Sequence, residues 1–178
     1  MACLQPGPRL CSSCRLALHR AAPRRVGQGL RVAPALAHEG VARSLVHQLK
    51  YRGMNGAARA LAIRMVPCLP DQARALIPIP RSWARLARFG IDPARELARE
   101  LGMLSALPVV SCLVAPLWTP AHAGRPRGSR ARPSFRVARL PPPGSVLVDD
   151  VITTGATLDS ASGVLGVTFA VTATSAGV

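Results

Sequence analysis

Acidic residues, aromatic residues and long apolar segments are all scarce in this sequence. Its 178 residues include 23 lysines and arginines against 8 aspartates and glutamates, a formal net charge of +15, which favours acidic partners on electrostatic grounds. No apolar run reaches the about 20 residues of a membrane-spanning helix, and the first residues lack the apolar segment of a secretory signal. We therefore expect a cytoplasmic protein with no membrane span.

Apolar residues as a class are not scarce. They make up 49% of the chain, enough for one domain with a real core. Aromatic residues amount to 3%, too few for the rows of aromatics that single-strand-binding proteins interleave with cations. Lys50 is the only lysine, and the arginine-rich composition is explained equally well by a GC-rich genome. Charge alone therefore does not assign a function.

The five cysteines are too few and too unevenly spaced for a disulfide framework. Cys11 and Cys14 form a C-x-x-C pair, and Cys3 lies shortly before it. Three thiolates can meet at one Zn²⁺ ion, but a closed structural site needs four ligands. His19 is the nearest candidate for the fourth position, and unligated thiols are the alternative. We expect zinc at well below one equivalent.

Composition divides the chain at about residue 32. Residues 1–32 are rich in arginine, proline and glycine and form an N-terminal Cys-containing appendage, whereas 33–178 form one domain. In that domain, apolar spacing predicts helices over 41–53, 56–65, 92–102 and 156–165, and strands over 75–79, 108–114, 146–148 and 167–172. This alternation predicts an α/β fold, a parallel sheet covered by helices on both faces.

Two adjacent carboxylates, Asp149 and Asp150, follow the strand expected at 146–148 and precede a hydroxyl-rich loop. Ligands of parallel sheets bind at the carboxyl ends of the strands. At the start of the next helix, an anion-binding nest is available from the backbone N–H groups of Thr153, Thr154, Gly155 and Ala156. The two carboxylates would repel that anion, so they must face neutral hydroxyl donors elsewhere on the ligand. A sugar phosphate presents both groups.

The stretch VLVDDVITTGAT at 146–157 resembles the phosphoribosyl pyrophosphate signature of type I phosphoribosyltransferases. Three further segments resemble the ComF family of competence-associated, phosphoribosyltransferase-like proteins: the N-terminal thiols, LVHQLKYRG at 45–53 and IPIPRSWARLARFG at 77–90. The resemblance implies a type I phosphoribosyltransferase-like fold with a small, degenerate zinc-finger-like segment at the N-terminus. It is degenerate because Pro6 stands where the family has a second thiol.

The resemblance also implies a role for each part of the motif. Asp149 and Asp150 would be the catalytic residues that bind the ribose 2′- and 3′-hydroxyls of phosphoribosyl pyrophosphate. The 5′-phosphate would bind the loop at Thr153, Thr154, Gly155 and Thr157. Arg81 and Ser82 would belong to the pyrophosphate loop, and Mg²⁺ would arrive with the pyrophosphate. The implied enzyme is a glycosyltransferase that moves a pentosyl group to an acceptor the resemblance leaves open.

A second interpretation is that the protein is a competence or DNA-uptake factor that binds single-stranded DNA on a phosphoribosyltransferase scaffold. Residues 118–136 show no period and are expected to form a long exposed loop. The basic side chains of this segment are Arg125, Arg127, Arg130, Arg132 and Arg136. We expect weak, sequence-independent binding of single-stranded DNA there, or alternatively a hood that covers the ribose phosphate.

Overall fold

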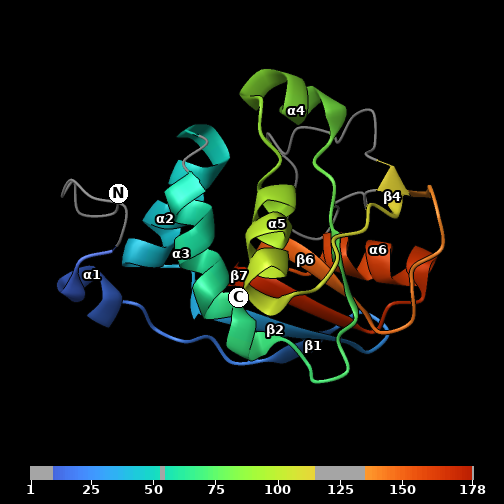
Figure 1. The fold of residues 1–178 in the computed structure, drawn as a ribbon, viewed down its shortest axis with the longest axis horizontal. Coiled ribbons are helices and arrows are strands. Elements are labelled where there is room, and N and C mark those ends of the chain that lie inside the picture. Colours follow the sequence, from blue (N-terminus) through green and yellow to red (C-terminus); the bar gives the residue numbers. More distant parts are fainter. Residues whose placement is uncertain (1–9, 53–54, 115–134, 178) are drawn as a thin grey trace.

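The computed structural model describes residues 10–52, 55–114 and 135–177. Within these residues, five strands form one sheet in the order β1-β2-β7-β6-β3. Figure 1 shows β1, β2, β6 and β7 of this sheet with the helices beside it. Strands β2 (Leu30–Ala37), β7 (Phe169–Ser175), β6 (Ser145–Ile152) and β3 (Ala75–Pro78) run parallel, and β1 (Arg24–Val26) is antiparallel to β2. The protein is therefore α/β, with a mixed and mostly parallel sheet flanked by helices.

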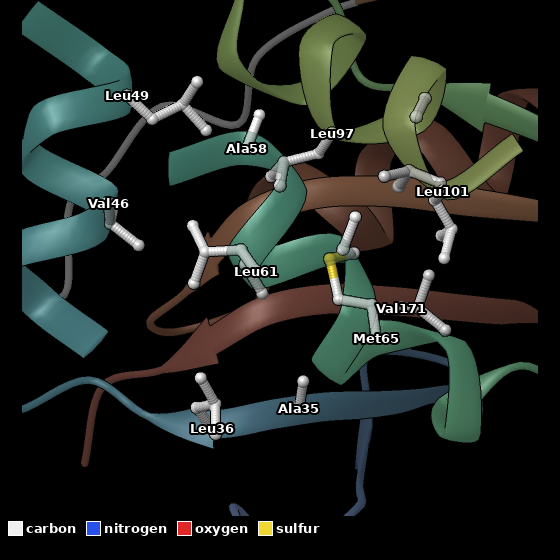
Figure 2. Close-up of a cluster of buried hydrophobic side chains, with 14 of the residues drawn as sticks. Ala35, Leu36, Val46, Leu49, Ala58, Leu61, Met65, Leu97, Leu101 and Val171 are labelled. Atoms are coloured by element: carbon white, nitrogen blue, oxygen red, sulfur yellow. The ribbon is translucent and has the colours of Figure 1, made fainter. Parts of the chain in front are cut away.

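Helices cover the two faces of this sheet unequally. Helices α2 (Gly40–Arg52), α3 (Asn55–Met65) and α5 (Pro93–Ser105) share one apolar core with the sheet, and α6 (Ala156–Leu165) shares a second. In the first core, Leu61 and Met65 of α3 lie between the other helices and the strands, and Met65 is close to Val171 of β7 (Figure 2). In the second, Leu158 of α6 packs with Leu147 of β6.

The helices expected over 41–53, 56–65 and 156–165 are confirmed as α2, α3 and α6. Helix α5 begins as expected, since the Asp92 carboxylate accepts the backbone N–H of Arg95 at 3.3 Å and Pro93 follows it. It does not end at Gly102 but runs on to Ser105. Gly102 is needed for close packing instead, because a Cβ there would lie 2.7 Å from the carbonyl oxygen of Leu107.

The strands expected at 75–79 and 167–172 correspond to β3 and β7, with ends that differ by up to three residues, whereas the other two expected strands differ more. Strand β6 continues past residue 148 to Ile152, so both carboxylates lie inside a strand rather than in the loop after it. The segment 108–114 is mostly irregular: Val109 makes one parallel bridge with Leu76, and β4 (Leu113–Val114) pairs with β5 (Arg136–Val137) in a separate two-stranded sheet. The apolar run had suggested a full strand, but its residues instead cover the edge of β3 and fill the second core.

The boundary expected at residue 32 falls inside strand β2, so 24–32 belong to the sheet. The sequence concealed both strands, because β1 carries two arginines and β2 contains Arg31 and Pro34, and proline ordinarily argues against an internal strand. The remaining short elements are α1 (Ser12–Leu16), the 3-10 helix η1 (Val66–Cys68) and α4 (Trp83–Phe89), none of which the sequence predicted.

Candidate functional site: a charged cleft at the carboxyl ends of β3 and β6

A cleft of about 780 Å³ opens where β3 and β6 end. This volume is in the range of sites that bind small molecules and cofactors. Several segments distant in the sequence contribute to its lining, and the polar members are His38, Lys50, Arg81, Ser82, Arg85, Arg88, Asp92, Asp149, Asp150, Thr153 and Thr157. The cleft lies at the edge of the sheet where parallel α/β proteins bind ligands.

The cleft brings together most of the site residues expected from the sequence. Asp149 and Asp150 line it from β6, Thr153 and Thr157 from the loop after β6, and Arg81 and Ser82 from the loop after β3. Thr154, Gly155 and Ala156 lie between the two lining threonines in the chain. The structure thus places the three segments singled out from the sequence around one cavity.

The two carboxylates differ in their surroundings. Asp150 pairs with Lys50 of α2, with Oδ2 and Nζ 3.2 Å apart, and its side chain is only 13% exposed. Oδ1 of Asp149 accepts the backbone N–H of Asp150 at 2.8 Å. Burial, followed by the nearby charge of Asp150, raises the pKa of Asp149 well above its usual value. The site therefore holds one carboxylate opposite a cation and a second whose ionisation is opposed by burial.

Lys50, near the C-terminal end of α2, is the one described residue of the LKYRG segment that both lines the cleft and pairs with a carboxylate there. The ammonium group lies in the cleft and pairs with a carboxylate of the DD motif. Its attraction for Asp150 is worth more here than on an open surface, because neither partner is fully exposed to solvent. Lys50 is therefore part of the cleft's charge arrangement.

His38, which follows β2, was not expected at this site. Its Nδ1 lies 2.8 Å from the Thr174 hydroxyl, which in turn donates to the backbone carbonyl of Asp150 at 3.4 Å. Because that hydroxyl uses its proton on the carbonyl, it accepts the Nδ1–H of His38, and Nε2 stays unprotonated. Burial, then the charges of Lys50 and Arg43, lower the pKa of His38, which favours the neutral ring.

The loop after β3 is held by Asp92, the residue that also caps α5. Oδ2 of Asp92 accepts the backbone N–H of Arg81 at 3.0 Å while Oδ1 caps α5. The Arg81 guanidinium donates to the Ile91 carbonyl at 2.9 Å and to the Lys50 carbonyl at 3.4 Å. Burial raises the pKa of Asp92, and the hydrogen bonds from Arg81 and Arg95 oppose that rise. One carboxylate therefore fixes both α5 and the loop.

Aromatic side chains gather at the cleft although the chain contains few of them. Tyr51 and Phe89 meet edge to face with ring centroids 5.0 Å apart, and Phe135 also lines the cavity. The guanidinium of Arg81 lies 4.7 Å from the Phe89 centroid and that of Arg88 lies 5.2 Å from it, distances typical of cation–π contacts. The sequence alone did not indicate this cluster, because Tyr51 of α2 and Phe89 of α4 are far apart in the chain and meet only in the fold.

The hydroxyl-rich loop enters α6 through Gly155, whose φ of 83° is in the left-handed region. The hairpin of β1 and β2 lies against this loop. A Cβ on Gly155 would be 2.7 Å from Cγ1 of Val26, and the Arg24 guanidinium donates to the carbonyl of Thr153. Sequence reasoning missed these contacts because the segment holding Arg24 and Val26 had been assigned to an appendage.

The thiols lie away from this cleft. Sγ of Cys11 accepts the backbone N–H of Cys14 at 3.5 Å, so Cys11 caps the short helix α1. His19, the candidate fourth zinc ligand, has Nδ1 2.8 Å from a Glu39 carboxylate oxygen. Cys3 lies outside the described residues, and within them no group of three or more His, Cys, Asp or Glu side chains is placed to hold a metal ion. Low zinc occupancy stays a prediction.

The arginines considered for DNA binding are only partly within the structure. Arg136 is exposed in β5, whereas Arg125, Arg127, Arg130 and Arg132 lie outside the described residues. In the part of the chain that is described, no helix is long and apolar enough to cross a membrane. No family model matches this sequence, and no curated protein matches it either.

Proposed function

We propose that this cleft binds phosphoribosyl pyrophosphate together with Mg²⁺ and that the protein is a type I phosphoribosyltransferase-like protein. The observation that carries the proposal is the meeting of three segments around one cavity: the carboxylates at 149–150, the threonine loop at 153–157 and the loop at 81–82. A sugar phosphate with a second phosphate group presents the complementary chemistry to all three.

Each part of the ligand has a chemically matched part of the cleft. The threonine loop, with the N-terminus of α6 behind it, suits the 5′-phosphate because backbone N–H groups and hydroxyls donate to anions. The two carboxylates suit the neutral ribose hydroxyls. The pyrophosphate suits the opposite wall, where Arg81, Arg85 and Arg88 supply positive charge. The ligand would thus span the cleft from α6 to α4.

The donors at the cleft fit Mg²⁺ as well. This ion prefers oxygen ligands, keeps several waters and commonly binds through one or two carboxylates plus substrate phosphates. Asp149 and Asp150 provide carboxylate oxygens at the cavity wall. When bound, Mg²⁺ would supply positive charge against the pyrophosphate. The protein residues would orient the ribose and hold the departing phosphates.

Pentosyl transfer would place developing positive charge at the ribose C1 as pyrophosphate leaves. With the ligand bound as proposed, the carboxylate side of the cleft would face the positive charge, and the arginines of the opposite wall would face the negative charge on the leaving pyrophosphate. Lys50 holds the Asp150 carboxylate in place from α2. The arrangement separates the two charges that the reaction creates, which supports transfer to an acceptor as the chemical role of the site.

Calorimetric titration with Mg²⁺ and phosphoribosyl pyrophosphate tests the proposal. Replacing both carboxylates, Asp149→Asn with Asp150→Asn, should weaken binding by at least about 3 kcal/mol, since hydrogen bonds to charged groups contribute about 1.5 to 3 kcal/mol each. The matched control is Asp71→Asn, which alters an exposed aspartate outside the cleft. Wild-type binding no tighter than that of the double variant would refute the proposal.

Binding of single-stranded DNA is proposed only as the alternative role. Its support is the net charge of +15 and the exposed arginines of α4 at the mouth of the cleft, Arg85 and Arg88. The volume of the cleft favours a small ligand over a strand, so phosphoribosyl pyrophosphate is the first choice. The two roles predict different effects of arginine loss.

A further inference from the structure

The hairpin of β1 and β2 contacts the threonine loop at 153–157 and the first turn of α6 at several residues. Arg24 donates to the Thr153 carbonyl, Val26 packs on Gly155, and Gly27 lies so close to Asp159 that a Cβ on Gly27 would be 1.5 Å from the carboxylate oxygen Oδ1. The hairpin and the loop are 129 positions apart in sequence at the hydrogen bond. These contacts make the hairpin a support for the loop on one side.

Strand geometry decides which arginine of β1 reaches the loop. Arg24 pairs with Val32 and Arg25 pairs with Arg31 in the antiparallel ladder, and neighbouring side chains on a strand point to opposite faces. Val32 is buried in the core that contains α6, so Arg24 lies on the α6 face and Arg25 on the other. The two adjacent arginines have the same side chain but lie on opposite faces of the sheet, so Arg25 is a matched control for Arg24.

The hydrogen bond from Arg24 fixes the orientation of the peptide between Thr153 and Thr154. In a trans peptide the N–H points opposite to the C=O. Arg24 is not among the residues that line the cleft, whereas Thr153 is. With the Thr153 carbonyl held on the hairpin side, the Thr154 N–H points the other way, away from Arg24. The left-handed Gly155 follows directly, as in the alternating backbone of an anion-binding nest.

Charge at the loop gives Arg24 a second effect. Asp150 lies before the loop and Asp159 lies in the first turn of α6, and both carboxylates repel a phosphate dianion. Arg24 brings a guanidinium against the loop, and its Nε is buried without a hydrogen-bond partner among the described residues. A cation behind the nest offsets part of that repulsion, and more so where water is excluded.

We propose that Arg24 is a positioning residue for phosphate binding: it holds the Thr153 carbonyl away from the cleft and places a positive charge behind the loop, so that the loop binds a phosphate monoester dianion. This rests on the proposed function, since it concerns the same loop. It adds the N-terminal hairpin to the binding machinery, although no part of the phosphate-binding motif lies there.

The experiment compares Arg24→Gln, Arg24→Lys and Arg25→Gln as full-length proteins. Each is titrated with ribose 5-phosphate, which needs the loop, and with pyrophosphate and Mg²⁺, which need the opposite wall. Arg24→Gln should weaken ribose 5-phosphate binding about tenfold, because charge-assisted hydrogen bonds contribute more than neutral ones, and should leave pyrophosphate binding unchanged. Arg24→Lys should recover part of the loss, and Arg25→Gln should match the wild type.

The outcomes separate this inference from the proposed function. If the wild type binds ribose 5-phosphate and Arg24→Gln binds it equally well, Arg24 has no positioning role and the function stands. Equal losses for both ligands, with no recovery by Arg24→Lys, would show a general structural effect and also overturn the inference. A wild type that binds neither ligand would overturn the proposed function itself, and the inference with it.

Discussion

The two walls of the cleft are built in different ways. The wall formed by β6, the threonine loop and α6 comes from one continuous segment, 145–165. The opposite wall is assembled from the end of α2, the loop after β3, helix α4 and the start of α5. The first wall could be predicted from the sequence, because the residues that line it are close together in the chain. The second exists only once the sheet has brought its parts together, so its integrity depends on contacts such as those of Asp92.

The largest expected effect is a loss of stability on replacing Asp92, which holds the segments of the assembled wall together. Asp92→Ala should lower the free energy of unfolding by about 2 to 4 kcal/mol, because it removes a helix cap of about 0.5 to 2 kcal/mol and a charge-assisted hydrogen bond of about 1.5 to 3 kcal/mol. The sum is reduced because the buried carboxylate, whose pKa is raised, carries a desolvation cost. Urea denaturation measures the loss.

Two further variants sharpen the Asp92 comparison. Asp92→Asn keeps an oxygen that can cap α5 and should lose less, while Asp71→Ala alters an exposed aspartate and should change little. With Arg81 loosened, Asp92→Ala should also bind pyrophosphate more weakly while binding ribose 5-phosphate as before. Equal stability of Asp92→Ala and Asp71→Ala would show that the wall does not depend on this carboxylate.

The contrast between the walls also explains which features the sequence predicted. The DD motif, the loop and α6 were located from one stretch, and Asp92 with Pro93 marked the start of α5. The extension of β6 through the carboxylates was missed, since two aspartates in a row oppose a strand assignment by propensity. Strands β1 and β2 were missed because arginine and proline obscure their alternation. Long-range partners such as Asp92 with Arg81, or Arg24 with Thr153, leave no local pattern.

A smaller effect is expected on the pH dependence of stability, through Asp149 in the continuous wall. Because the pKa of Asp149 lies well above the ordinary value of 3.8, the folded protein binds a proton that the unfolded chain releases. This contribution to stability is complete below the ordinary value and is lost as pH rises through the raised pKa, by up to about 1.4 kcal/mol per pH unit. Thermal melting of wild type and Asp149→Asn across this window should show a pH-dependent difference. Parallel curves would contradict the burial argument.

The smallest effect expected is on DNA. Weak binding to single-stranded DNA should be steeply salt-dependent, with a slope of about −0.7 in log affinity against log salt for each phosphate neutralised. Removing Arg125 and Arg127 should flatten the slope by roughly one to one and a half units if the segment contacts DNA. If it is a hood, these changes should instead weaken binding of phosphoribosyl pyrophosphate. Unchanged DNA affinity after loss of all five arginines, from Arg125 to Arg136, would exclude a DNA groove there.

The central claim is that one sugar phosphate ligand spans both walls, and a crystal structure of the protein with phosphoribosyl pyrophosphate and Mg²⁺ tests it most directly. The account predicts the 5′-phosphate within hydrogen-bonding distance of the backbone N–H groups of 153–157, the ribose hydroxyls at Asp149 and Asp150, and the pyrophosphate beside Arg81. A ligand bound outside this cleft, or bound with its 5′-phosphate on the α4 wall and its pyrophosphate on the threonine loop, would contradict it.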